Sequence, residues 1–206
     1  ITSSIFTSLS AFLIYKLAFS IFQDYQVSII ASFLFLTNFV VINLHQVGLI
    51  DSAYCFSFIL LLYILLHKKL FLLVPLFLIA TLTKEQFVVF GSVILTTYYL
   101  LKLNTYKQID YQAMVLIALS ISLSVITLII FQSYVRGEIT YPWQIITDTE
   151  KLSVTVYNLE LFTSRVSRFI MVIGPILFLA IPNLNKINRD ILISFLIVII
   201  IQLILG

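Results

Sequence analysis

Charged residues are scarce in this sequence: they make up 10% of its 206 residues, while 61% are hydrophobic. A soluble domain carries about 25% charged and about 45–50% apolar residues, so the scarcity excludes an ordinary globular domain, a disordered segment and a nucleic-acid-binding module. The single cysteine, Cys55, excludes an internal disulfide. The sequence also lacks a glycine-rich phosphate loop, a Cys-x-x-Cys pair and a His-Glu-x-x-His motif, which argues against soluble nucleotide-dependent chemistry.

Long apolar stretches take the place of these features, and the mean hydropathy is +1.13. A backbone inside lipid must satisfy its own hydrogen bonds, and helices do this segment by segment. The alternation that a membrane barrel requires is absent. The sequence therefore predicts an all-α polytopic transmembrane helical bundle, a single domain over 1–206. The eight predicted helical segments are 4–21, 27–46, 52–66, 70–83, 86–101, 112–132, 163–182 and 191–206.

The positions of the basic residues predict an orientation. Cytoplasmic loops of membrane proteins carry an excess of Lys and Arg. The regions 67–69, 102–107 and 183–190 hold six of the 12 Lys and Arg residues and suit one cytoplasmic side. With both flanks inside, 70–101 is predicted to be a short hairpin that turns at Thr83-Lys84-Glu85, since a single helix would leave these charges at mid-bilayer at about 2.5–3.5 kcal/mol each.

Three polar regions then share the non-cytoplasmic face: residues 45–51, residues 83–85 and a long outer loop over 133–162. The loop leads to Arg165 and Arg168, which stand three residues apart and so on one helical face. These arginines either extend to lipid headgroups or bind a phosphate, for which guanidinium has a matching two-pronged geometry. Gly91 and Pro75 are predicted to mark kinks.

Two interpretations remain open for each other candidate. Asp51 opens an uncharged run, so it is either a helix cap favoured by the helix dipole or a carboxylate facing a cleft. Lys84 and Glu85 are either a solvated turn pair or cleft residues. His45 lies six residues before Asp51 and either rests at the interface or joins Asp51 in holding a divalent metal, although two ligands are too few for a secure site.

The pattern around Asp51 resembles a known family. Val47-Gly48-Leu49-Ile50-Asp51-Ser52-Ala53, an apolar helix, the basic turn His67-Lys68-Lys69, a short helix and Ala80-Thr81-Leu82-Thr83-Lys84-Glu85 are similar to the central stretch of GT-C membrane glycosyltransferases. The narrower likeness is to the branch of protein O-mannosyltransferases and the lipid A aminoarabinose transferase. In that branch an aspartate opening an apolar helix precedes a Leu-Thr-Lys element by some thirty residues, and here Asp51 and Lys84 stand 33 apart. The resemblance covers about residues 1–105.

The resemblance implies a transferase that uses a polyprenyl-phosphate-linked sugar as donor and a lipid or protein as acceptor, with its site outside the cytoplasm. Family members commonly use an acidic residue of the first outer loop as base or to position the acceptor, and a second one, matching Asp51, to shape the site. The only acid before Asp51 is Asp24, which the orientation places inside. We expect the first span and loop to precede Ile1 in a longer protein; the alternative is an inactive relative.

Other function classes predict different features. A transporter or flippase of lipid-linked saccharides would place ionisable groups at mid-membrane and often shows repeated halves. A non-catalytic membrane subunit would lack an acid in the preceding outer loop. A multi-pass plasma-membrane protein is expected, and the abundance of Ile, Asn and Lys suggests a prokaryote.

Overall fold

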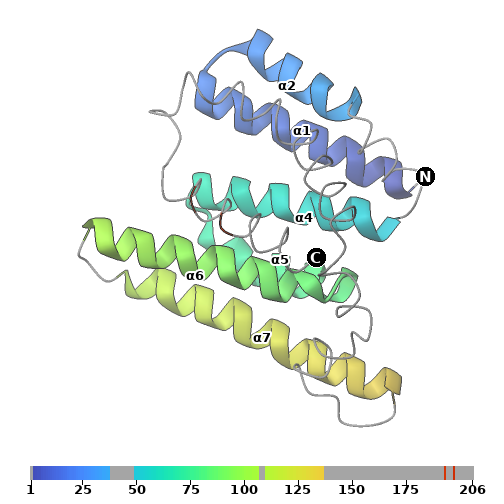
Figure 1. The fold of residues 1–206 in the computed structure, drawn as a ribbon, viewed down its shortest axis with the longest axis vertical. Coiled ribbons are helices and arrows are strands. Elements are labelled where there is room, and N and C mark those ends of the chain that lie inside the picture. The colour runs from blue at the N-terminus through green and yellow to red at the C-terminus, as the bar shows by residue number, and fades with distance from the viewer. Residues whose placement is uncertain (1, 38–48, 107–109, 137–192, 194–196, 198–206) are drawn as a thin grey trace, which may run out of the picture. The chain divides into compact units, whose positions relative to one another are not determined.

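The computed structural model describes residues 2–37, 49–106 and 110–136, together with Ile193 and Ile197 (Figure 1). Over these residues the chain is built from helices and contains no strand, as the sequence predicts. In chain order the elements are α1 (Thr2–Phe22), α2 (Tyr25–Thr37), α4 (Leu49–Leu66), the 3-10 turn η1 (Leu70–Leu72), α5 (Leu73–Thr83), α6 (Gln86–Tyr106) and α7 (Tyr111–Arg136).

These helices fall on the predicted segments from 4–21 to 112–132. The predicted segment 163–182 lies outside the described residues, as does 191–206 apart from Ile193 and Ile197. Among the described helices, three are long and apolar enough to cross a membrane: Ser3–Phe22, Gln86–Leu103 and Tyr111–Val135. The other apolar helical stretches, Tyr25–Thr37, Ser52–Leu66 and Leu70–Thr83, are shorter, and a bilayer core about 30 Å thick takes about 20 helical residues. Length and composition thus indicate a helical membrane protein.

The described residues divide into two compact units, the first ending at Lys68 and the second beginning at Lys69. In the first unit α1 turns tightly into α2 through Gln23, whose φ of 56° lies in the left-handed region. Asp24 then caps α2, because its Oδ1 accepts hydrogen bonds from Gln26 N at 2.7 Å and Val27 N at 3.3 Å.

Serine hydroxyls link the helices of the first unit. Ser32 of α2 donates to the carbonyl oxygen of Ala11 in α1 at 2.9 Å, and the hydroxyls of Ser3 in α1 and Ser52 in α4 share a hydrogen bond of 2.8 Å. The rings of Phe6 and Phe56 pack 5.7 Å apart between centroids. The contacts move in the same direction along both helices, from Ser3 to Phe6 in α1 and from Ser52 to Phe56 in α4. The two helices therefore run parallel, with their first turns side by side. Small residues and hydroxyl bonds at helix contacts are typical of membrane bundles.

The second unit contains a helical hairpin. α5 ends at Thr83 and α6 begins at Gln86, so only Lys84 and Glu85 connect them. The Phe77 ring of α5 meets the Phe87 ring of α6 edge-on, with centroids 5.1 Å apart. A Cβ added to Gly91 would lie 2.9 Å from Phe77 Cζ, so Gly91 serves as a point of close helix approach within a continuous α6. Gly91 thus has a packing role in addition to the kink that the sequence predicts.

α7 returns beside both helices and makes its most extensive contacts with α5. It also touches η1, which precedes α5. The start of α5, the end of α6 and the start of α7 therefore share one end of the unit, and the Lys84–Glu85 turn lies at the other. This path agrees with the hairpin predicted for 70–101.

Candidate functional site

Asp51 lies in the first turn of α4, which begins at Leu49. The next residue, Ser52, is buried and bonded to Ser3, so the backbone of Asp51 is fixed where the first turns of α1 and α4 meet. The side chain of Asp51 is outside the described part of the structure. The backbone position matches the expectation of an aspartate opening an apolar helix.

Lys84 ends α5 in an extended conformation, with φ −153° and ψ 115°. Its N–H donates to Ala80 O at 2.9 Å and its carbonyl accepts from Phe87 N at 3.0 Å, while Glu85 O accepts from Val88 N at 3.1 Å. These bonds close the last turn of α5 and the first turn of α6 around a two-residue connection. The Lys84 side chain is half-buried and that of Glu85 is exposed.

The hairpin packs tightly beneath this turn. Phe77, Phe87 and Ala80 are buried, and Thr83 Oγ1 donates to Ile79 O at 2.9 Å. The backbone of Lys84 is thus held at two points, by its N–H and by its carbonyl.

The structure describes only some of the predicted site residues. Lys84 and Glu85 are adjacent in the second unit, while Asp51 belongs to the first, so a pocket common to them stays a prediction. His45, Arg165 and Arg168 lie outside the described residues, as does nearly all of the outer loop 133–162. Across the described ranges no group of three or more His, Cys, Asp or Glu side chains is arranged to hold a metal ion.

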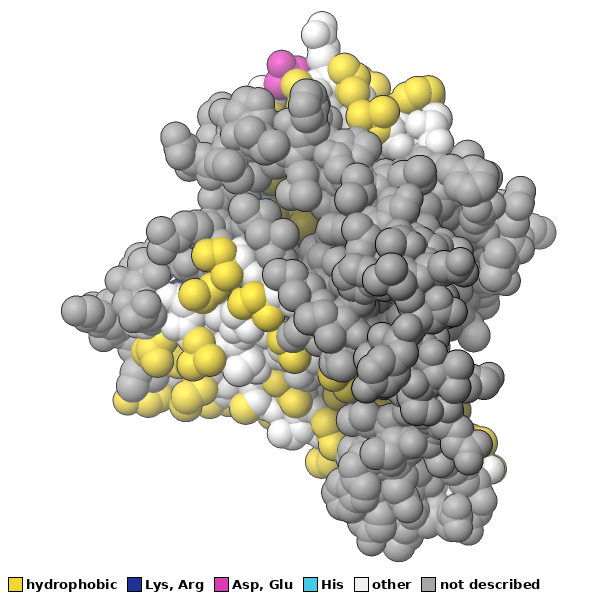
Figure 2. All heavy atoms as spheres, viewed as in Figure 1, with side chains coloured by type: hydrophobic (Ala, Val, Ile, Leu, Met, Phe, Trp, Pro, Cys, Tyr) yellow, Lys and Arg dark blue, Asp and Glu magenta, His cyan; other side chains and the backbone are white. Residues whose placement is uncertain are grey.

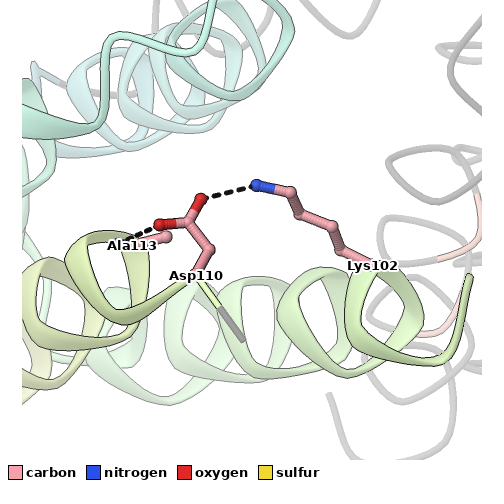
Figure 3. Close-up of polar contacts among 3 residues, drawn as sticks. All are labelled: Lys102, Asp110 and Ala113. Atoms are coloured by element: carbon pink, nitrogen blue, oxygen red, sulfur yellow. Dashed lines mark hydrogen bonds and ion pairs between the residues drawn. The ribbon is translucent and has the colours of Figure 1, made fainter. Parts of the chain in front are cut away.

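One polar contact that the sequence analysis did not anticipate is the ion pair between Lys102 of α6 and Asp110, 2.9 Å long (Figure 3). The other carboxylate oxygen of Asp110 accepts from Ala113 N at 3.0 Å and so caps α7. The hydrogen bond from Lys102, and then that from Ala113, lower the pKa of Asp110 below its usual value. An aspartate three residues before an apolar run is a sequence signal for such a cap.

This ion pair belongs to the end of the second unit opposite the Lys84 turn. It neutralises one of the basic residues used to assign that end to the cytoplasm. Acidic residues contribute little to the positive-inside preference, so the predicted orientation does not depend on whether Lys102 is paired.

Buried hydroxyls are a second feature that the sequence did not reveal. In the second unit the side-chain oxygens of Thr81, Ser92, Tyr99 and Ser124 are buried and form no hydrogen bond. They come from α5, α6 and α7, so each helix contributes polar atoms to the interior. Their presence fits a bundle in which hydroxyl residues allow close helix packing.

Comparisons of the chain with protein-family models, with curated proteins and with solved structures find no match.

Proposed function

We propose that this chain is part of an integral membrane glycosyltransferase of GT-C type, which transfers a sugar from a polyprenyl-phosphate carrier to a lipid or protein acceptor on the non-cytoplasmic face. The observation that carries the proposal is the order of elements between Asp51 and Lys84. An aspartate lies in the first turn of α4, a basic turn follows that helix, and Lys84 closes the short helix α5. The two residues stand 33 positions apart.

The direction of the chain supports a common rim for these two residues. Along the sequence, α4 separates Asp51 from the basic residues Lys68 and Lys69, and α5 separates these basic residues from Lys84. Basic residues between two helices favour a cytoplasmic turn. Asp51 and Lys84 would then both lie towards the non-cytoplasmic side.

The placement of charge supports an enzyme over a transporter. Within the described ranges every Asp, Glu, Lys and Arg lies between helices or within two turns of a helix end. A transporter commonly places ionisable groups near mid-membrane, where they bind ions or protons. Charges at a rim are better placed to meet a phosphate group at the headgroup level.

Each group has a task in the proposed transfer. The acceptor oxygen or nitrogen attacks the anomeric carbon of the sugar and loses a proton to a carboxylate, while the bond from that carbon to the phosphate oxygen breaks. The electron pair leaves with the polyprenyl phosphate, whose negative charge is stabilised by cations. Asp51 is proposed to shape the acceptor side, and Lys84 with Arg165 and Arg168 to bind the phosphate.

The proposal is tested by measuring sugar transfer by the full-length protein and its variants in membranes. Asp51→Asn is expected to lower the rate by up to about 10²-fold, since misplacing a reactant by about 1 Å can cost that much. Lys84→Ala is expected to lower it at least tenfold. Lys69→Ala, an exposed cation on the opposite flank of α5, is the matched control and should stay within about twofold. Unchanged transfer by both Asp51→Asn and Lys84→Ala would refute the proposed roles.

A further inference from the structure

α7 has two chemically different faces. One face is buried and consists largely of small residues: Ala113, Ser120 and Ser124, with Ile117 and Leu128 at the same helical spacing. The opposite face is exposed and bulky. Four of its large apolar side chains recur at intervals of four or seven residues. These are Val115, Leu119, Ile126 and Ile130, here called the outer face of α7.

The small residues identify the buried face as the helix contact. Helices in membranes associate through Gly, Ala, Ser and Thr, which let backbones approach closely. α7 contacts α5 extensively, and Ser120 and Ser124 are fully buried. The outer face is therefore the side of α7 turned away from the helices that it packs against. Hydrophobic side chains cover parts of the described surface in view in Figure 2.

Tyrosines bound the outer face at both ends of the helix. Tyr111 is 67% exposed and Tyr134 is 86% exposed. They are 23 residues apart, which corresponds to about 34 Å of α-helix. The hydrocarbon core of a bilayer is about 30 Å thick, and exposed tyrosines are enriched at its two boundaries.

No charged residue lies between these two tyrosines, and charged residues follow shortly beyond both of them. Residues 111–135 contain no Asp, Glu, Lys or Arg. Asp110, paired with Lys102, directly precedes Tyr111, and Arg136 follows Val135. An apolar face with an aromatic and then a charged boundary at each end has the layered composition of a bilayer.

We infer that the outer face of α7 contacts the acyl chains of the bilayer directly, with Tyr111 and Tyr134 at the two headgroup levels. Branched and bulky side chains occupy this face, whereas the buried face contains the small residues Ala113, Ser120 and Ser124, which favour helix contacts. The inference concerns the rotation and depth of α7 and is independent of the proposed transferase activity.

The exposed side of α7 also carries Ala118 and Ser122, four residues apart near the middle of the helix. This spacing resembles the small-residue contacts of paired membrane helices. A second helix docked on the outer face would cover this pair first. Ala118 and Ser122 are therefore the positions at which a lipid environment and a protein partner should give different results in a labelling experiment.

The experiment is a spin-label scan of α7 in the full-length protein, reconstituted in vesicles of phosphatidylcholine and phosphatidylglycerol. Single cysteines replace residues 111–134 in a Cys55→Ala background, and collision rates with oxygen and with a water-soluble nickel complex are compared. We expect a high collision rate with oxygen and a low one with nickel at positions 115, 119, 126 and 130. The difference should be largest near the helix centre, and the nickel collision rate should rise at positions 111 and 134.

Positions 118 and 122 should follow the oxygen pattern of their neighbours. Low oxygen collision confined to 118 and 122, or extending to the four outer positions, would show a protein partner and overturn the inference. High nickel collision along the outer face would show a water-filled environment and overturn it as well. Ile117 and Ser124 are buried, so labels there would disturb the packing of α7, and the outer positions alone decide the outcome.

Discussion

The Nζ atom of Lys102 lies 2.9 Å from Oδ2 of Asp110 and joins the end of α6 to the start of α7 (Figure 3). Both side chains are partly exposed, at 28% and 41%, so water and salt weaken the attraction. Asp110 also holds the first turn of α7 through Ala113 N. One carboxylate thus serves two purposes, which substitutions can separate.

Replacing Asp110 should distinguish the cap from the ion pair. Asp110→Ala removes both and is expected to lower the free energy of unfolding by about 1–2 kcal/mol, of which the cap accounts for about 1 and the screened ion pair for less. Asp110→Asn keeps a good capping residue and should cost well under 1 kcal/mol. Reversible unfolding in mixed micelles gives both values. Equal losses in the two variants would contradict this division.

The stabilisation by Asp110 should depend on pH. Its folded pKa is depressed, first by the hydrogen bond from Lys102, so the stabilising effect is complete above the unfolded value of about 3.9 and is lost as pH falls through the folded pKa. The stability difference between the natural protein and Asp110→Asn should be constant from about pH 5 to 8 and shrink below about pH 4. A difference that grew on acidification would have the wrong sign.

Gly91 should tolerate no side chain beside Phe77. A Cβ would lie 2.9 Å from Phe77 Cζ and 3.2 Å from Phe87 Cε1, and both rings are fully buried. Gly91→Ala is expected to destabilise the hairpin by about 1–3 kcal/mol through overpacking, in spite of the better helix propensity of alanine. Adding Phe77→Leu should recover part of the loss, measured as a coupling in a double-mutant cycle. Additive losses would show that the two sites do not meet.

The Ser3–Ser52 hydrogen bond should couple α1 to α4 weakly. Such bonds in membrane proteins average about 0.6 kcal/mol in double-mutant cycles. Ser3→Ala, Ser52→Ala and the double variant are expected to give a coupling of about this size in unfolding measurements. Ser57→Ala is a suitable control, because the Ser57 hydroxyl bonds Ala53 O within α4. A coupling between Ser3 and Ser57 as large as that with Ser52 would contradict the parallel register.

The hairpin was predictable because charged residues mark its turn. Lys84 and Glu85 interrupt an apolar sequence, and the cost of burying them in lipid favours a turn at that point. The position of Asp51 in the first turn of α4 follows from the apolar run that it opens. Local features of the candidate site could therefore be read from the sequence.

Packing partners could not be predicted in the same way. The helices are apolar on most sides, so no amphipathic stripe distinguishes a buried face from a lipid face. The three-dimensional path of the chain decides that α5 packs closely against α7. It also decides that the Phe77 ring packs against Gly91. The Lys102–Asp110 pair escaped prediction because it joins side chains eight positions apart that belong to different elements.

The proposed transferase requires Asp51 and the Lys84 turn to face the non-cytoplasmic side together. Single cysteines at positions 51, 68, 85 and 107, in a Cys55→Ala background, can be treated in intact cells with a membrane-impermeant maleimide. We expect labelling at 51 and 85 from outside, and at 68 and 107 only after the membrane is permeabilised. Labelling of 68 and 107 in intact cells, with 85 protected, would contradict the orientation and the transferase proposal that depends on it.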